Sequence, residues 1–378
     1  MLAVETKASK RWLRKLTSPE HIFPVSSFFF AFLLFFIKAS IIETNLLSFV
    51  IIEVTATTLV LCTIFAVLHH AEVIAQRVGE PYGMLILTLA VTCIEVSIII
   101  SMMLHGENNP TLARESVFST VMIVCSGIVG LAITLGALRH KRQELKTQGT
   151  TAFLSVLIAT TGLTMILPNY TLSAGSTGTF TPIQLMFVAL LSFLLYASFL
   201  IAQSKGQKDD FIQCAADEQS RAPDSDSSMP AHFIFLMTGL FGIVLLTEFV
   251  ASGVENGLAY LNVPQTDAIV GALIAAVILL PEAISAIRAS LNNQLQRGLN
   301  IALGSACATI GLTIPAVAIA SLVVSRPLSL GLDHGDIVLI LMALSMSALS
   351  FATGRTTLLT GLSHLVIFVA YLMLIVVP

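Results

Sequence analysis

Charged residues are scarce in this chain: Asp, Glu, Lys and Arg make up only 11% of its 378 residues. A soluble domain usually carries about a quarter charged residues, and a water-facing surface cannot be built from so few. Hydrophobic residues make up 56% of the sequence, and the mean hydropathy is +0.90. The composition therefore excludes a soluble enzyme and predicts an integral membrane protein. The net charge of −3 is small and indicates no nucleic-acid partner.

Cysteine is also scarce, and the cysteines are scattered singly along the chain. The five are Cys62, Cys93, Cys125, Cys214 and Cys307. They lack the close spacing of zinc ligands, and four of them lie in apolar runs, so they form neither a disulfide framework nor a zinc site. We expect no bound cofactor.

Apolar runs long enough to cross a bilayer dominate what remains, since a membrane helix needs about 20 mostly apolar residues. The runs cover residues 22–38, 46–68, 82–104, 115–138, 150–170, 181–203, 232–255, 266–291, 299–324, 335–354 and 358–377. The predicted fold is therefore an all-α integral membrane protein of about 11 transmembrane helices.

The positions of Lys and Arg predict how these helices are oriented, because short cytoplasmic loops are rich in both. With the N-terminus in the cytoplasm, 16 of the 19 fall on the cytoplasmic side, and only Lys38, Arg114 and Arg326 fall outside. The basic stretch 1–16 has no small-residue cleavage site, so we expect an uncleaved cytoplasmic tail. We place the C-terminus outside and the protein in a bacterial inner (cytoplasmic) membrane.

One long polar segment divides the chain, and it carries six acidic residues. It is either a solvated linker or a cytoplasmic segment that senses cations. The predicted divisions are 1–45, the basic tail and first helix; 46–203, helices 2–6; 204–231, the acidic linker; and 232–378, helices 7–11. Five helices per half is an odd number, so the halves cross the membrane in opposite orientations. Such inverted repeats are typical of transporters with a midplane substrate site.

Two carboxylates lie near the middle of apolar helices: Glu95 in the third helix and Glu282 in the eighth. Ionisable groups inside a bilayer are expensive and are usually functional. These helices are each the second of their half, so we expect both carboxylates to converge on one cation and proton site. The alternative is that local hydrogen bonds satisfy each one separately.

The surroundings of both glutamates fit a cation site. Pro281 cannot donate a backbone hydrogen bond and clashes with the preceding turn, which predicts a freed carbonyl near Val277. Hydroxyl side chains on the same or adjacent helices are candidate supporting ligands: Thr88, Thr92, Ser126, Ser305 and Thr309. Small polar residues also allow close helix packing, and that reading stays open for each of them.

A second polar set lies toward the helix edges. Glu248 and Glu255 are seven residues apart and share one face of the seventh helix. His69 and Glu72 come at the predicted end of the second helix, the corresponding helix of the other half. We interpret these as points where ions or protons enter, with ordinary interfacial charges as the alternative. Glu53 has no counterpart in the seventh helix, and we assign it no role.

Three segments around these residues resemble the calcium/proton exchangers of the cation/Ca2+ exchanger superfamily, and in particular their bacterial sodium–calcium/proton antiporter branch. They are RVGEPYGMLILTLAVTCIEV at 77–96, ALGSACATIGLTIP at 302–315 and LTEFVASGVE at 246–255. The first segment is similar to the family's first repeat, in which a Gly-Glu pair leads to a Gly-Asn-x-x-Glu motif. The pair corresponds to Gly79-Glu80 here. The resemblance places the motif glutamates at Glu95 and Glu282.

The chain departs from the family pattern beside both motif glutamates. Val91-Thr92 and Ile278-Leu279 stand where the family has Gly-Asn, and Ala308 stands where it usually has Gln. These changes bear on ligand geometry and ion selectivity, while both glutamates are kept. The resemblance implies a secondary transporter that exchanges Ca2+, and also Na+ or K+, for H+ by alternating access.

Charge balance gives this expectation a physical basis. Ca2+ prefers carboxylate oxygens, and one Ca2+ neutralises two carboxylates. Without the cation, two buried carboxylates take up protons, so either species fills the site and never both. A Na+/H+ antiporter with little Ca2+ activity and an ion channel remain alternatives. An intramembrane enzyme is disfavoured, since the sequence has no HExxH motif or intramembrane Asp pair, and His364 lacks an obvious nucleophile.

Overall fold

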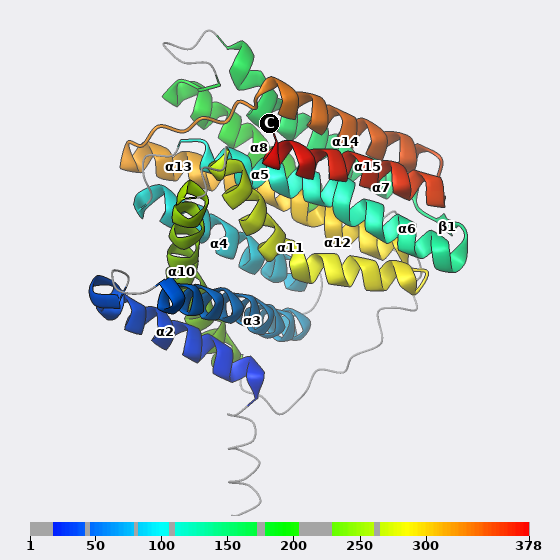
Figure 1. Cartoon of the computed structure of the whole chain (residues 1–378). Coiled ribbons are helices and arrows are strands. Elements are labelled where there is room, and N and C mark those ends of the chain that lie inside the picture. The colour runs from blue at the N-terminus through cyan, green and yellow to red at the C-terminus, as the bar shows by residue number, and fades with distance from the viewer. Residues whose placement is uncertain are drawn as a thin grey trace, which may run out of the picture. The chain divides into compact units, whose positions relative to one another are not determined.

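The computed structural model describes residues 18–41, 46–78, 82–105, 110–171, 178–203, 229–260 and 265–377, and these are almost entirely helical (Figure 1). The α-helices are α2 (Pro19–Ile41), α3 (Leu46–Val78), α4 (Tyr82–His105), α5 (Leu112–Met122), α6 (Val129–His140), α7 (Thr147–Thr161), α8 (Pro182–Ile201), α10 (Met229–Tyr260), α11 (Thr266–Leu291), α12 (Leu295–Ala308), α13 (Ile314–Val324), α14 (His334–Ala352) and α15 (Leu358–Val376). The remaining elements are the π-helices η1 (Ile123–Ile128), η2 (Gly162–Ile166) and η6 (Thr309–Thr313), the 3-10 helix η3 (Leu167–Tyr170), and the strands β1 (Gln143–Glu144) and β2 (Arg355–Thr356).

Each predicted membrane helix has a counterpart in this order, which confirms the fold class. Within the described residues, nine helical spans are long and apolar enough to cross a membrane. Shorter apolar stretches, Pro19–Leu34 and Leu89–Ile100, supply the cores of α2 and α4. Helices suit this environment because hydrocarbon offers no hydrogen-bond partner, so every backbone group must be satisfied within the segment.

One boundary differs from the prediction in a way that affects the candidate site. Helix α3 continues to Val78, well past the predicted end at residue 68. His69 and Glu72 therefore lie inside a long helix and not at its end, which corrects the prediction. The sequence beyond residue 68 is polar, but it contains no Gly or Pro before Gly79, so nothing in it stops the helix.

The described helices group into two compact units. Unit one comprises residues 1–105 and 221–256, with α2, α3, α4 and most of α10. Within it, α3 packs against both α2 and α4. Glycines of α10 permit close approach: a Cβ added at Gly239 would lie 2.4 Å from a methyl of Val67, and one at Gly242 would lie 2.2 Å from the hydroxyl oxygen of Ser27.

Unit two comprises residues 106–220 and 257–378. In it, the third span of each half packs against the last helix of the other half. The span α5–η1–α6, third in its half, packs against α15, the last helix of the other half. The span α12–η6–α13, third in its own half, packs in the same way against α8. The two contacts are equivalent between the halves, as expected for inverted repeats. The exact repeat boundaries, 46–203 and 232–378, stay a prediction.

Both of these third spans contain a π-helical turn, η1 in one and η6 in the other. Each turn carries a glycine that faces an aromatic ring. A Cβ added at Gly127 would lie 3.1 Å from the ring of Phe368, and one at Gly311 would lie 2.5 Å from the Cβ of Tyr196. Because π-turns inside α-helices often mark functional positions, these two turns stand out as matched features of the two halves.

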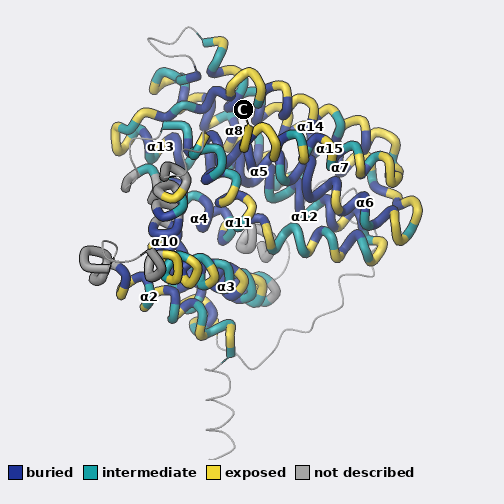
Figure 2. Tube along the Cα trace, viewed as in Figure 1, coloured by how far each residue is buried: buried dark blue, intermediate teal, exposed yellow. Residues whose placement is uncertain are grey.

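The middle of unit two is its most buried part. Every residue of α5 is buried, and Figure 2 shows dark blue along this helix. The connecting loops meet at two ends. At one end β1 pairs antiparallel with β2, joining two loops that we predict to be cytoplasmic. At the other end Thr179 bridges to Ser329, joining two loops that we predict to lie outside.

Candidate functional site

Helix α11 carries Glu282 and belongs to unit two. It remains helical through Pro281, and the freed carbonyl near Val277 stays a prediction. One carboxylate oxygen of Glu282, Oε2, is shielded from solvent. Helix α11 packs against α5, η1, α6 and α12, which surrounds this helix with protein rather than lipid along those contacts. A carboxylate in such a place must be neutralised by a proton, a cation or close partners.

Helix α4 carries Glu95 and belongs to unit one. The residue is 3% exposed, and Thr92, one turn earlier, is 6% exposed. Buried Ile94 and Ile98 flank the glutamate along the same helix. The side chain of Thr88 lies outside the described residues, as do the Gly79-Glu80 pair that precedes α4. A buried glutamate beside a buried threonine hydroxyl is a suitable pair of oxygen donors for a hard cation.

The other predicted supporting residues lie in unit two, on η1, α12 and η6, and of these elements η1 and α12 contact the helix of Glu282. Ser126 is buried within η1, which contacts α11, and its hydroxyl donates to the carbonyl oxygen of Met122. Thr309 is buried at the first position of η6, and Ser305 is half-buried in α12. Ser126 and Thr309 thus occupy the two matched π-turns. Their role as ligands stays a prediction.

The predicted points of ion and proton access are resolved only in part. His69 Nε2 lies 3.2 Å from the Glu20 carboxylate, and both side chains are partly exposed. Glu72 is exposed on the same helix. The side chains of Glu248 and Glu255 lie outside the described residues, so their roles stay predictions. Glu20 is a partner of His69 that the sequence analysis did not identify, because it comes from a different helix.

Glu53 is a carboxylate that the sequence analysis set aside. Both of its carboxylate oxygens are shielded from solvent. They lie against α10, because a Cβ added at Gly253 would be 2.0 Å from Glu53 Oε1. The glycine provides the space that the carboxylate occupies. The signal was available in the sequence, since any carboxylate within an apolar helix is a candidate for function.

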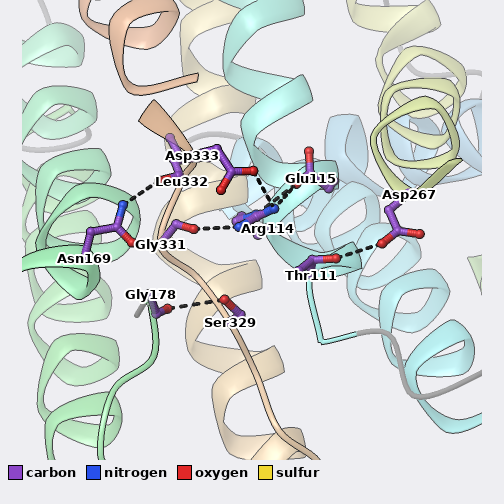
Figure 3. Close-up of polar contacts among 10 residues, drawn as sticks. All are labelled: Thr111, Arg114, Glu115, Asn169, Gly178, Asp267, Ser329, Gly331, Leu332 and Asp333. Carbon is purple, nitrogen blue, oxygen red and sulfur yellow. Dashed lines mark hydrogen bonds and ion pairs between the residues drawn. The ribbon is translucent and has the colours of Figure 1, made fainter. Parts of the chain in front are cut away.

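Arg114 and Glu115 form a buried ion pair in unit two (Figure 3). Both Nε and Nη2 of Arg114 donate to Glu115 Oε1, at 2.8 and 2.6 Å. Nη1 donates to the carbonyl oxygen of Gly331 at 2.7 Å, and Nη2 lies 3.5 Å from Asp333 Oδ2. The pair lies against α11, where a Cβ added at Gly271 would be 2.8 Å from the Cβ of Glu115.

Further hydrogen bonds extend this network across the loops (Figure 3). Thr111 donates to Asp267 Oδ2 at 2.9 Å, which joins the starts of α5 and α11. Asn169 donates to the carbonyl oxygen of Leu332 at 2.5 Å. From the sequence, Arg114 is expected only as a charge in a loop on the outside, and nothing there indicates this network. Its partners are up to 217 positions apart, so no local pattern could indicate it.

A resident metal centre has no support in the described part of the chain. Within it, no group of three His, Cys, Asp or Glu side chains is arranged to hold a metal ion.

Known proteins similar to this chain are membrane transporters of one family. The family described as sodium/calcium exchanger protein matches residues 47–205 and 231–377. The chain is 40% identical over 320 residues to y4hA of Sinorhizobium fredii (strain NBRC 101917 / NGR234), which is named provisionally as an ionic transporter; the match covers 83% of this chain and 86% of that protein. It is 36% identical over 323 residues to the sodium-potassium/proton antiporter ChaA of Escherichia coli (strain K12), covering 84% and 86%. The structure of the Ca2+/H+ antiporter protein YfkE superposes with a TM-score of 0.68 at 15% identity, covering 95% and 99% of the two chains.

Proposed function

Because this chain belongs to the sodium/calcium exchanger protein family, we propose that it is a secondary active transporter that exchanges cations for protons across the bacterial inner membrane. The observation that carries the proposal is the burial of a carboxylate in the second helix of each half. Glu95 is 3% exposed in α4, and Glu282 has a shielded carboxylate oxygen in α11. An ionisable group inside a membrane is costly and by default marks a functional site, such as an ion or proton pathway.

Competition between cation and proton accounts for exchange. Together the two glutamates carry two negative charges, which one Ca2+, two monovalent cations or two protons neutralise. Carboxylate oxygens are good ligands for hard cations when ionised and lose that ability when protonated. A carrier that changes its accessible side only with neutralised carboxylates moves one species each way. The inward proton gradient then drives the cation outward.

The transported cation is the finer part of the proposal. Two negative charges favour Ca2+, and the structurally similar YfkE is a Ca2+/H+ antiporter. Na+ and K+ form the second candidate, supported by the 36% identity to a sodium-potassium/proton antiporter. The replacement of the family's Gly-Asn by Val91-Thr92 and Ile278-Leu279 removes amide oxygens, which supports a site with fewer ligands.

Ion flux in everted membrane vesicles tests both parts of the proposal. An imposed pH gradient should drive uptake of radioactive Ca2+ or Na+ or of Rb+ as a K+ tracer, and the comparison identifies the cation. Glu95→Gln and Glu282→Gln should each abolish the flux while the protein remains folded. Glu144→Gln serves as the matched control, because that carboxylate is exposed in β1. Full flux in either buried-site variant at equal expression would refute the assignment.

A further inference from the structure

His364 in α15 is fully buried in unit two, and the transport site described above does not use it. Both of its ring nitrogens have partners on other elements. Nδ1 lies 2.8 Å from the carbonyl oxygen of Cys125 in η1, which is 239 positions away in the sequence. Nε2 lies 2.9 Å from the hydroxyl oxygen of Ser350 in α14. The ring therefore joins the last helix of the chain both to α14 and to one of the two matched π-turns.

The π-turn explains why the Cys125 carbonyl uses a donor from another helix. In an α-helix the N–H of Val129 would bond the carbonyl oxygen four residues earlier, which is that of Cys125. Here the N–H of Val129 bonds the carbonyl oxygen of Val124, five residues earlier. The Cys125 carbonyl thereby loses its α-helical donor. A carbonyl oxygen only accepts, so Nδ1 of His364 carries a hydrogen and replaces that donor.

Two glycines let α15 approach closely enough for this bond. A Cβ added at Gly127 would lie 3.1 Å from the ring of Phe368, and one at Gly130 would lie 3.0 Å from the Cβ of His364. Both distances are shorter than ordinary van der Waals contact. Residues three apart share one face of a helix, so the face with these two glycines is the one that packs on α15.

Ser126 lies beside this face and is directed elsewhere. It precedes Gly127 by one residue, which is about a quarter of a turn around the helix. Its hydroxyl donates to the carbonyl oxygen of Met122. A hydroxyl has one hydrogen and two lone pairs, so this bond leaves the lone pairs of Ser126 able to accept. Ser126 is fully buried, and η1 contacts α11, the helix of Glu282.

We propose that His364 is a positioning residue for the cation site. By holding the Cys125 carbonyl it fixes the π-turn, and the π-turn keeps the lone pairs of Ser126 directed to a cation bound at Glu282. A π-turn contains one residue more than an α-turn, so its loss would rotate Ser126 relative to α6 by about 100°. His364 itself touches no cation. This inference rests on the proposed function and adds one residue to its site.

The variants His364→Asn and His364→Gln separate the two contacts of the ring. The amide of Asn reaches the position of Nδ1 and still donates to the Cys125 carbonyl, whereas the amide of Gln reaches the position of Nε2 and bonds Ser350 instead. Exchange is measured in everted vesicles with whichever of radioactive Ca2+, Na+ or Rb+ the parent transports. His364→Gln should raise the KM for that cation about three- to tenfold, the effect of one misplaced polar ligand. His364→Asn should stay within about twofold of the parent.

The KM distinguishes positioning from a purely structural role. A variant that is partly unfolded has a lower maximal rate, but its folded fraction keeps the KM of the parent. Parent KM values in both variants would overturn the proposal, and so would the reverse order. Ser350→Ala is the matched control, because it removes the other hydrogen bond of the same ring. Its KM should equal that of the parent, and an increase as large as that of His364→Gln would overturn the specific role of the Cys125 bond.

A double-variant cycle tests whether His364 acts through Ser126. Ser126→Ala removes the oxygen that the π-turn is proposed to direct, so it should raise the KM at least as much as His364→Gln. The double variant His364→Gln/Ser126→Ala should then have the KM of Ser126→Ala alone, since nothing is left to misplace. Independent, multiplying effects of the two changes would overturn the proposal, as would a parent KM in Ser126→Ala.

Equilibrium binding separates this inference from the proposed function. Binding of radioactive Ca2+ or Na+ to purified protein in lipid nanodiscs is followed by scintillation proximity at alkaline pH, where the carboxylates are ionised. The parent, His364→Asn and Ser350→Ala should bind with similar affinity, and His364→Gln should bind more weakly. If no cation is exchanged for protons but the affinities follow this order, the proposed function fails and the positioning role stands. Equal affinity of the parent and His364→Gln, or no binding by the parent, overturns the positioning role.

Discussion

The buried ion pair of Arg114 and Glu115 makes a quantitative prediction about stability. Replacing Arg114 by Gln removes both donors to Glu115 Oε1 and the bond to the Gly331 carbonyl. Glu115 then stays buried without its counter-charge, at 6% side-chain exposure. Removing one partner of a buried pair costs about 3–5 kcal/mol, so Arg114→Gln should lower the free energy of unfolding by about that amount. The contact to Asp333 adds little, because that side chain is 76% exposed.

An exposed pair in the same unit provides the control. Arg355 and Glu144 lie 3.2 Å apart, with side chains 64% and 75% exposed. Water and salt screen such a pair, so Arg355→Gln should cost about 1 kcal/mol or less. The double variant Arg114→Gln/Glu115→Gln should recover part of the loss, since no uncompensated charge then remains.

Unfolding by SDS in mixed micelles, followed by near-ultraviolet circular dichroism, measures these differences through the packing of aromatic side chains. The expected order of stability is the parent and Arg355→Gln first, the double variant next and Arg114→Gln last. The reasoning would be refuted if Arg114→Gln cost no more than Arg355→Gln. It would equally fail if the double variant were less stable than the single one.

Three further predictions concern packing, access and topology. Gly311→Ala should cost about 1–3 kcal/mol, since its Cβ would lie 2.5 Å from that of the α8 tyrosine; Gly304→Ala, with 3.7 Å to its nearest neighbour, should change stability by less than about 1 kcal/mol. Equal costs in the same unfolding assay would contradict this account. Glu255→Gln should reduce flux and shift its pH dependence without abolishing it, and kinetics unchanged across pH would indicate an ordinary interfacial charge. A phosphatase fused after Val377 should be active and one fused within 204–231 inactive, and the reverse pattern would invert the topology.

The sequence alone determined which segments cross the membrane and which of them carry buried carboxylates. Both follow from the free-energy cost of placing a polar group in hydrocarbon. That cost depends on residue type, so it can be evaluated along the sequence without knowing which residues are neighbours in space. Every predicted apolar run therefore became a helix, and Glu95 came out buried. The same scale indicated Glu53 as well, and the sequence analysis missed it because it required a counterpart in the other half.

Tertiary structure alone decided how the polar groups within each unit find partners. His364 and Cys125 are 239 positions apart, and Arg114 and Gly331 are 217 apart, so no periodicity or spacing connects them. The π-turns η1 and η6 also left no mark in the hydropathy, because one additional residue per turn leaves an apolar helix apolar. Hydropathy fixes a helix in the bilayer but not its rotation or its neighbours. Those depend on close packing at positions such as Gly311 and on hydrogen bonds between distant helices, which exist only after the chain has folded.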